Sequence, residues 1–225
     1  NNRKYLIENM ASKIFMISAS ISVISLLLII GFVFYKGLTP FIFKGYSFLD
    51  FLIGTDWLPN SDKFGVSSMI IASILATLGS LIIGVPIGIL TAIFLAEIAP
   101  KPVQKLILPA VELLAGIPSV LYGLFGLAFI VPKIQSTLNL PKGQSLLAVI
   151  LVLAIMMLPT IISVSQTAIK AVPKSYKEGS LALGASEIET IFKVILPAAK
   201  SGILAAIVLG VGRAIGETMA VILVA

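Results

Sequence analysis

Polar and apolar positions in this 225-residue chain form long blocks, not the short alternations of a soluble protein. Runs that are apolar and nearly free of charge cover residues 14–35, 66–96, 106–131, 145–169 and 201–225. Each is long enough to cross a hydrocarbon core of roughly 30 Å as a helix. The pattern predicts an all-α membrane protein, a polytopic helical bundle with five spans. The last run reaches Ala225 without a polar flank, so we expect a sixth helix missing from this chain.

The blocks predict a simple organisation. Residues 1–13 form a polar head before the first span, 14–35. That first run is too long for the apolar part of a signal peptide and lacks a cleavage site. Residues 36–65 mix aromatic and polar side chains, which is typical of a surface loop with one interfacial helix. Residues 66–225 form the core domain, interrupted by a polar hairpin at 170–200.

Glycine and proline residues lie inside the apolar runs, where they affect packing or bend helices. Gly84 and Gly88 have the small-xxx-small spacing that lets two helices approach closely, and Gly212 and Gly216 repeat it. We expect hinges or kinks at Pro86, Pro159, and the Gly116 to Pro118 stretch. So many breakers in 106–131 predict a bent or interrupted helix that is shielded by protein or lines a cavity.

Composition excludes several classes of function. The chain is 58% hydrophobic and 12% charged, with a mean hydropathy of +1.11, far from soluble usage. It contains no Cys and no His, which removes disulfides, thiol nucleophiles, His metal sites and Ser-His-Asp catalysis. We expect no metal site, and the chain has no phosphate-binding loop, so ATP would have to be bound by another chain.

The basic residues predict the orientation. With the N-terminus in the cytoplasm, that side carries ten basic residues and the opposite side five, a bias that supports this topology. The ten are Arg3, Lys4, Lys13, Lys101, Lys105, Lys170, Lys174, Lys177, Lys193 and Lys200, and the five are Lys36, Lys44, Lys63, Lys133 and Lys142. The hairpin 170–200 then faces the cytoplasm.

Two capping boxes are predicted in the hairpin, Ser175 with Glu178 and Ser186 with Glu189. They indicate two short helices with a sharp turn at Gly184. The residues alone leave open whether the hairpin is a docking element or an ordinary solvated loop.

The fifth run contains its own ionisable pair, Arg213 and Glu217, with Thr218 beside it. At i,i+4 spacing on a helix, Arg213 and Glu217 share one face. Charges within a membrane usually face a bundle interior or an aqueous path. An arginine fork suits phosphate or carboxylate, and Glu217 would hold Arg213 in place or pair with a partner subunit. A purely structural ion pair is the alternative.

The hairpin resembles the "EAA" loop of ABC importer permeases. Glu178-Gly179-Ser180 occupies the position of the E-A-A residues of that loop. Gly184 occupies the position of its glycine, and Val194 to Pro197 that of its I-x-L-P residues. The segments 116–127 and 212–221 are similar to the PstC-type permease family of phosphate-specific ABC importers. The resemblance implies that the hairpin couples to an ATPase through Ser175, Glu178, Gly179, Ser180, Ala182, Leu183, Gly184, Ala185, Ser186, Glu187, Leu196 and Pro197.

The same resemblance implies a type I (MetI-like) permease fold in a prokaryotic plasma (inner) membrane. Its partners would be a second permease, an ATPase dimer that holds ATP and Mg²⁺, and an extracytoplasmic phosphate-binding protein. No cofactor is expected on this chain. Arg213, Glu217 and Thr218 would line the phosphate pathway. Alternatives are a permease for sulfate or molybdate, a self-sufficient secondary transporter or channel, and, least supported, a membrane enzyme.

Overall fold

The computed structural model describes residues 2–43, 45–61 and 63–225, in two compact units, 1–69 and 70–225. Lys44, which enters the charge count, and Asp62 lie outside the described residues, as do the side chains of Arg3 and Lys4.

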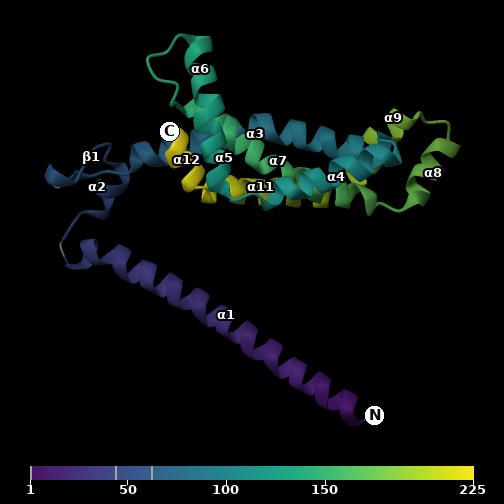
Figure 1. Cartoon of the computed structure of the whole chain (residues 1–225), viewed down its shortest axis with the longest axis horizontal. Coiled ribbons are helices and arrows are strands. Elements are labelled where there is room, and N and C mark those ends of the chain that lie inside the picture. The colour runs from purple at the N-terminus through teal and green to yellow at the C-terminus, as the bar shows by residue number, and fades with distance from the viewer. Residues whose placement is uncertain (1, 44, 62) are drawn as a thin grey trace. The chain divides into compact units, whose positions relative to one another are not determined.

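The first unit begins with one long helix and ends with a small folded segment (Figure 1). Its elements are α1 (Asn2–Phe43), α2 (Phe48–Ile53), the two-residue strands β1 (Trp57–Leu58) and β2 (Lys63–Phe64), and the 3₁₀ turn η1 (Pro59–Ser61) between them. The strands pair antiparallel, with Trp57 opposite Phe64. No side chain of the apolar segment of α1 is buried, as expected for a lipid-facing helix.

Helix α1 contains the predicted span 14–35 and continues beyond both of its ends. The interfacial helix expected in 36–65 corresponds to α2, which exposes Phe48, Leu49 and Ile53. The strand pair was not predicted, because two residues are too few to show an alternating pattern.

The second unit is a helical bundle whose chain is broken at several points. Its elements are α3 (Ser67–Ile93), η2 (Phe94–Ile98), α4 (Lys101–Gly116), α5 (Ser119–Phe125), η3 (Gly126–Ile130), α6 (Val131–Leu138), α7 (Leu146–Lys170), α8 (Lys174–Ala182), α9 (Glu187–Thr190), η4 (Ile191–Ile195), α10 (Leu196–Ala198), α11 (Lys200–Gly216) and α12 (Met219–Val224). The three η elements are π-helical turns.

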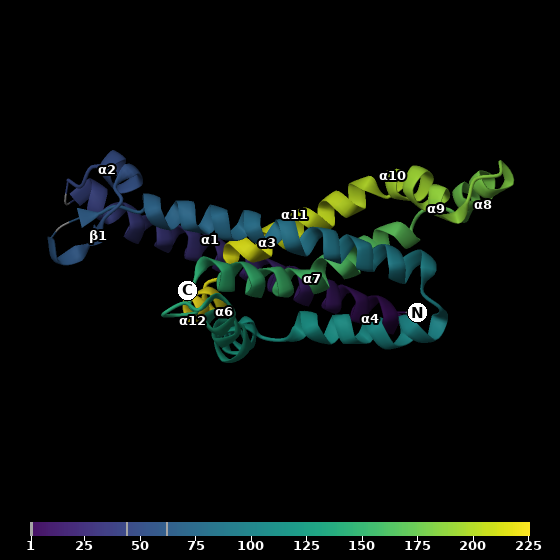
Figure 2. The same cartoon turned by 90° about the horizontal axis from the view of Figure 1, so that it is seen from above.

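Helix α7 is the centre of this bundle, with α3, α4 and α11 alongside it (Figure 2). Four buried clusters contain residues of α7. One joins Ile162 to Val111 of α4, and the other three follow one another along the helix. Met156 belongs to the first, with Tyr122 and Val224. Ile161 packs with Ala214 in the second. Ile169, near the other end, is in the third with residues of the hairpin. Burial of these apolar faces against α7 holds the bundle together.

Two glycines allow α3 to approach α7. A Cβ on Gly84 would lie 2.7 Å from Met157 Sδ, and one on Gly88 would lie 2.7 Å from Ile161 Cγ2. Both distances are below van der Waals contact, so a side chain at either position would force the facing side chains or the helices to shift. The spacing of Gly84 and Gly88 thus corresponds to a real close approach. Pro86 lies exposed between them, and α3 continues through it to Ile93.

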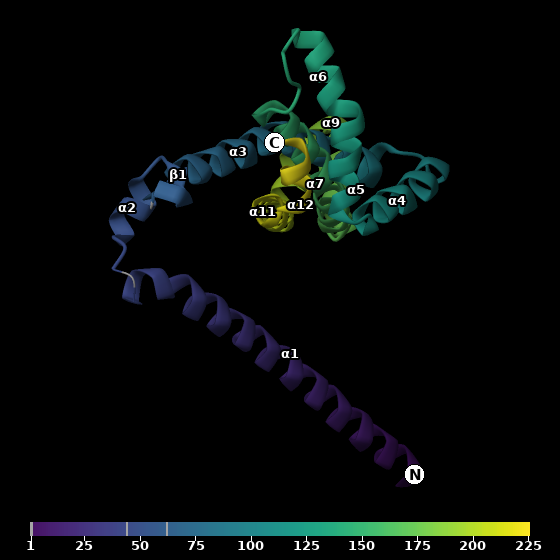
Figure 3. The same cartoon turned by 60° about the vertical axis from the view of Figure 1, so that its left-hand side comes forward.

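The interruption predicted in 106–131 is present. Helix α4 ends at Gly116, and α5 begins at Ser119 with Pro118 as its N-cap residue. Beyond the break, α5, η3 and α6 form one rod that runs crosswise to α7 (Figures 1 and 3). The hinge or kink expected at Pro159 does not interrupt its helix. Pro159 is buried inside α7, which is continuous.

The described residues contain four helices long and apolar enough to cross a membrane, or up to five if a bent pair is one span. The pair is Glu187–Ala198 with Lys200–Gly216, bent by 71°. The fifth predicted span, 201–225, is wrong as one continuous helix, because α11 ends at Gly216 and α12 begins only at Met219.

Candidate functional site

Arg213 lies in the last turn of α11, half-buried against α7. Its Nη1 donates a hydrogen bond to Thr160 Oγ1, at 3.2 Å. Small residues on α11 make this contact possible, since Ala214 is buried and a Cβ on Gly210 would lie 3.0 Å from Ile161 Cγ1. The guanidinium is thus anchored by one bond and keeps four other N–H donors for a ligand.

Glu217 is not paired with Arg213, and the expectation that both share one helix face is wrong. Helix α11 ends at Gly216, and Glu217 follows with φ −78° and ψ 116°, an extended conformation. Glycine is a poor helix former and β-branched Thr218 is weaker than alanine, so the sequence here opposes a continuous helix. Among the described residues, Arg213 forms no ion pair with any carboxylate.

The remaining predicted pathway and packing residues surround this break. Thr218 precedes α12 and is exposed, without a side-chain capping bond. Gly212 and Gly216 are also exposed, and a Cβ on either would meet no atom of the described residues within 4 Å. Within the chain, close packing of α11 therefore uses Gly210, not the predicted Gly212 and Gly216.

Sequence reasoning missed Thr160. It follows Pro159 in an apolar run, and a polar residue beside a helix proline was the available signal. Its partner is 53 residues away, so no local pattern identifies the contact.

The polar hairpin projects from one end of the second unit as α8 and α9 (Figure 1). The chain reverses at Gly184, whose φ of +85° is in the region that favours glycine. The capping box at Ser186 is confirmed. Its hydroxyl accepts from the amide of Glu189, and the Glu189 carboxylate accepts from the amide of Ser186.

The other capping box, Ser175 with Glu178, is wrong. Helix α8 starts two residues earlier than that box requires, with Pro173 as the N-cap residue and no side-chain capping bond. Ser175 is therefore already inside the helix, and its hydroxyl is not the cap.

One ion pair and one apolar cluster fix α8 and α9 to the bundle, and a contact between two hydroxyls joins the arms of the hairpin to each other. Lys177 Nζ on α8 lies 2.6 Å from Glu97 Oε2 on η2. The hydroxyls of Ser180 and Thr190 are 2.9 Å apart and join the two arms. Beneath them, Ile191 packs with residues of η4, α3 and α7 in one buried cluster, whose other members are Ala92, Ile93, Ile169, Ile195 and Ala199.

The face of the hairpin away from these contacts is exposed. Leu183 at the turn is 91% exposed, Ile188 69% and Phe192 54%. Most of the other predicted coupling residues share this exposure, namely Ser175, Glu178, Gly179, Ala182, Gly184, Ser186, Glu187 and Pro197, whereas Ser180, Ala185 and Leu196 are half-buried. An apolar tip of this size on a polar hairpin is typical of a protein contact surface.

Hydrogen bonds stabilise the carboxylate of Glu189. The side-chain bond from Lys193, at 3.0 Å, and the bonds from the Ser186 amide and hydroxyl lower the pKa of Glu189 from 4.5 to about 2. The second arm of the hairpin is thus held in its capped form across the physiological pH range. Among the described residues, no group of three or more Asp and Glu side chains is placed to hold a metal ion.

Residues 84–225 match the family described as binding-protein-dependent transport system inner membrane component. The chain belongs to this family. It is 45% identical over 213 residues to the probable ABC transporter permease protein YqgH of Bacillus subtilis, which covers 94% of this chain and 67% of the relative. It is 37% identical over 190 residues to the phosphate transport system permease protein PstC of Mesorhizobium japonicum and to that of Pasteurella multocida.

These two PstC matches cover 76% of this permease and 58% and 59% of the relatives, so the chain spans less than two thirds of their length. A solved structure of the MetNI methionine ABC transporter in inward-facing conformations superimposes with a TM-score of 0.52, at 22% identity over 68% of each chain. The chain is therefore a multi-pass helical membrane protein with the MetI-type permease fold, as predicted.

Proposed function

We propose that this chain is the transmembrane permease subunit of an ATP-driven importer of inorganic phosphate. Support comes from several relatives that carry the name phosphate transport system permease protein PstC. The observation that carries the proposal is Arg213, a half-buried cation in a membrane helix, bonded to Thr160 and free of any carboxylate of its own described chain.

The chemistry of this site suits an oxyanion. Guanidinium binds phosphate oxygens through two parallel N–H donors and remains charged at any working pH. Thr160 holds the guanidinium from α7 without neutralising it, because a hydroxyl carries no charge. Attraction from one cation and a few hydrogen bonds stays modest, which transport needs because a tightly held ion is not released.

The exposed hairpin supplies the coupling to ATP. We propose that α8 and its apolar tip seat on a separate ATPase dimer, which binds ATP and Mg²⁺, while this chain binds no cofactor. A second permease would complete the pathway, and an extracytoplasmic phosphate-binding protein would deliver the anion. The excess of basic residues on the hairpin side supports a cytoplasmic N-terminus and hairpin.

In this mechanism, closure of the ATPase dimer moves α8, and the ion pair from Lys177 to Glu97 carries the movement to the end of α3. The buried cluster around Ile191 passes it to α7, and α7 bears Thr160. Alternating access then changes the exposure of Arg213 between the two sides.

The test is reconstitution of the full-length chain with its own second permease, ATPase and binding protein in proteoliposomes. Phosphate-loaded binding protein should stimulate ATP hydrolysis and uptake of radiolabelled phosphate, whereas sulfate and molybdate should not. Stimulation by sulfate or molybdate instead would make the chain a permease for another oxyanion. Phosphate transport by the chain alone, without ATPase, would contradict the proposal.

A further inference from the structure

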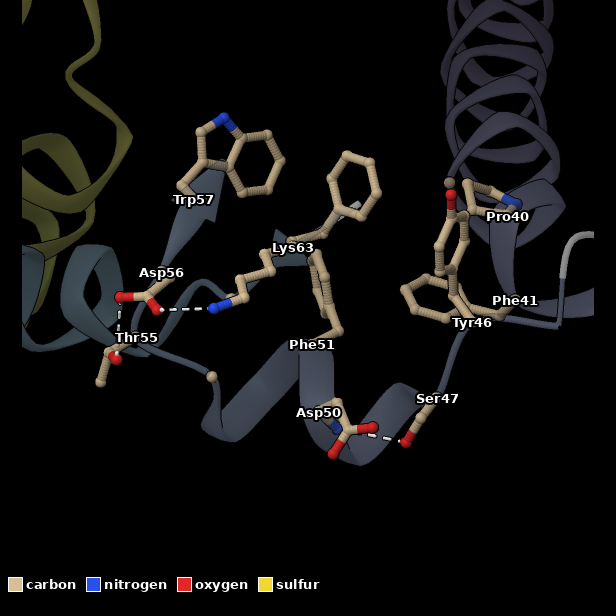
Figure 4. Close-up of a pocket in the computed structure, with 14 residues that line it drawn as sticks. Pro40, Phe41, Tyr46, Ser47, Asp50, Phe51, Thr55, Asp56, Trp57 and Lys63 are labelled. Carbon is tan, nitrogen blue, oxygen red and sulfur yellow. Dashed lines mark hydrogen bonds and ion pairs between the residues drawn. The ribbon is translucent and has the colours of Figure 1, made fainter. Parts of the chain in front are cut away.

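The first unit contains a pocket of about 740 Å³, and none of the residues proposed for transport lines it (Figure 4). Its wall comes from the end of α1, from α2 and from the two strands, all within residues 37–65. Aromatic rings form much of the lining and pack edge to face. Ring centroids of Phe41 and Phe51 are 5.1 Å apart, those of Tyr46 and Phe64 5.0 Å, and those of Trp57 and Phe64 5.7 Å.

The charged lining residues are two carboxylates and one ammonium group, Asp50, Asp56 and Lys63. Lys63 Nζ lies 3.6 Å from Asp56 Oδ2, and both side chains are more than half exposed, so the pair is loose. The Asp50 carboxylate accepts no hydrogen bond from the described residues. The described lining therefore carries a net negative charge beside several aromatic faces.

The pocket lies where the chain leaves the apolar layer of the membrane. Gly37, Pro40 and Phe41 belong to the last turns of the candidate span Glu8–Phe43, and Gly65 lies two residues before α3, which starts the next. Exposed apolar side chains of α2 adjoin the pocket, with Leu49 66% and Ile53 71% exposed. Such side chains are stable beside lipid and costly in water.

We propose that this pocket binds the headgroup of a phospholipid that carries an ammonium group, of the phosphatidylethanolamine type. Aromatic faces attract a cation within about 6 Å of the ring centroid, and Asp50 adds a carboxylate for the ammonium. Lys63, released from its loose pair, bonds the phosphodiester. The net negative lining disfavours headgroups that carry only negative charge, including phosphatidylglycerol and free phosphate.

Trp57 reports directly on this pocket, because it is the only Trp of the chain and lines the wall. The full-length chain is reconstituted in phosphatidylglycerol vesicles that contain a minor fraction of lipid with brominated acyl chains. Brominated phosphatidylethanolamine should quench Trp57 fluorescence more than brominated phosphatidylglycerol at equal mole fraction. A cation–aromatic contact predicts a roughly two- to fivefold preference.

Asp50→Asn removes the charge at nearly constant shape and should abolish most of the preference. Glu112→Gln, an exposed carboxylate on α4 outside the pocket, is the matched control and should keep it. Unfolding temperature and Trp57 emission maximum, measured for both variants, separate a lost preference from a lost fold.

Equal quenching by the two brominated lipids in the wild-type chain overturns the proposal, as does an unchanged preference in Asp50→Asn with intact folding. If neither lipid quenches, and added extracytoplasmic binding protein shields Trp57 from aqueous acrylamide, a protein side chain occupies the pocket and the lipid assignment is wrong.

Discussion

Lys177 and Glu97 form an ion pair of 2.6 Å between residues 80 positions apart, and so connect the polar hairpin to the end of α3. The Glu97 side chain is only 12% exposed, so water does not replace its partner well. This contact is the direct polar link between α8 and η2 among the described residues.

Charge reversal at either residue should uncouple the transporter. Lys177→Glu places two carboxylates together, and Glu97→Lys two ammonium groups, at a cost of about 1–3 kcal/mol for the unpaired charge. We expect either variant to lower phosphate uptake per ATP hydrolysed in proteoliposomes. The double exchange, Lys177→Glu with Glu97→Lys, should restore it, and a double variant no better than the singles would contradict this role.

Arg213→Gln should leave the complex assembled but abolish phosphate uptake, because the amide keeps polarity and loses the charge that holds the anion. Arg213→Lys should keep part of the activity. Assembly is checked by co-purification of the subunits and transport by radiolabelled phosphate. Normal uptake by the Gln variant would remove Arg213 from the pathway.

Thr160→Val should reduce uptake about tenfold, since one hydrogen bond to a charged group is worth roughly 1.5 kcal/mol. The matched control is Thr167→Val on the same helix, whose hydroxyl bonds the backbone of Ser163 within α7. Uptake should be near normal in the control. Equal losses in both variants would mean that any Thr to Val change on α7 impairs the protein.

Gly184→Ala and Gly179→Ala test the hairpin turn with the same added methyl group. Gly184 has φ of +85°, where a Cβ costs about 1–2 kcal/mol. Gly179 is inside α8 with open space around it, so alanine should stabilise the helix by about 0.5–1 kcal/mol. Amide hydrogen exchange in residues 174–195 should therefore accelerate in the first variant and slow in the second. If amide hydrogen exchange changed in the same direction in both variants, the turn geometry would be refuted.

The contact between α3 and α7 predicts that Gly84→Ala lowers the stability of the chain by about 1–3 kcal/mol, because its Cβ would overlap Met157. The added methyl group of Gly212→Ala meets no atom of the described residues within 4 Å, so this variant should leave the unfolding temperature unchanged. Thermal unfolding in detergent distinguishes the two. Loss of the second permease from the Gly212 variant alone would place that glycine at the subunit contact.

The depressed pKa of Glu189 predicts how the hairpin responds to acid. Because the folded-state pKa of about 2 is below the ordinary 4.5, the carboxylate stabilises the fold above pH 4.5, and this contribution is lost as pH falls from about 4.5 to about 2. The protection factors of the α9 amides, which correct for the pH dependence of intrinsic exchange, should fall over that range. Glu189→Gln should exchange faster at neutral pH and lose the pH dependence, while Glu187→Gln, without the capping bond, should resemble the wild type.

Features that depend on local pattern were predictable from the sequence. Apolar blocks indicated where helices lie, although 201–225 is broken after Gly216. The spacing of Gly84 and Gly88 indicated a close helix contact, although the same spacing at Gly212 and Gly216 marks none among the described residues. The Ser186 capping box depends on residues three apart, so the sequence contains all of it.

Features that depend on distant partners or on the position of a helix end were not predictable from the sequence. Arg213 bonds Thr160 on another helix, and no spacing rule relates the two residues. The proposed pair of Arg213 with Glu217 assumed a continuous helix, and the break after Gly216 removed that assumption. Ser175 failed as a cap for a similar reason, since a shift of the helix start by two residues changes which side chain can reach the free amides.

The break after Gly216 also affects whether cations can leak through the proposed transport pathway. A pathway that opens alternately to two sides must not conduct protons or sodium ions while it is empty. Because the break leaves the Arg213 guanidinium without a carboxylate of its own described chain, its field in a medium of low dielectric constant repels cations. If Arg213 lines the proposed phosphate pathway, the same fixed charge that attracts an oxyanion would also protect the ion gradients of the cell.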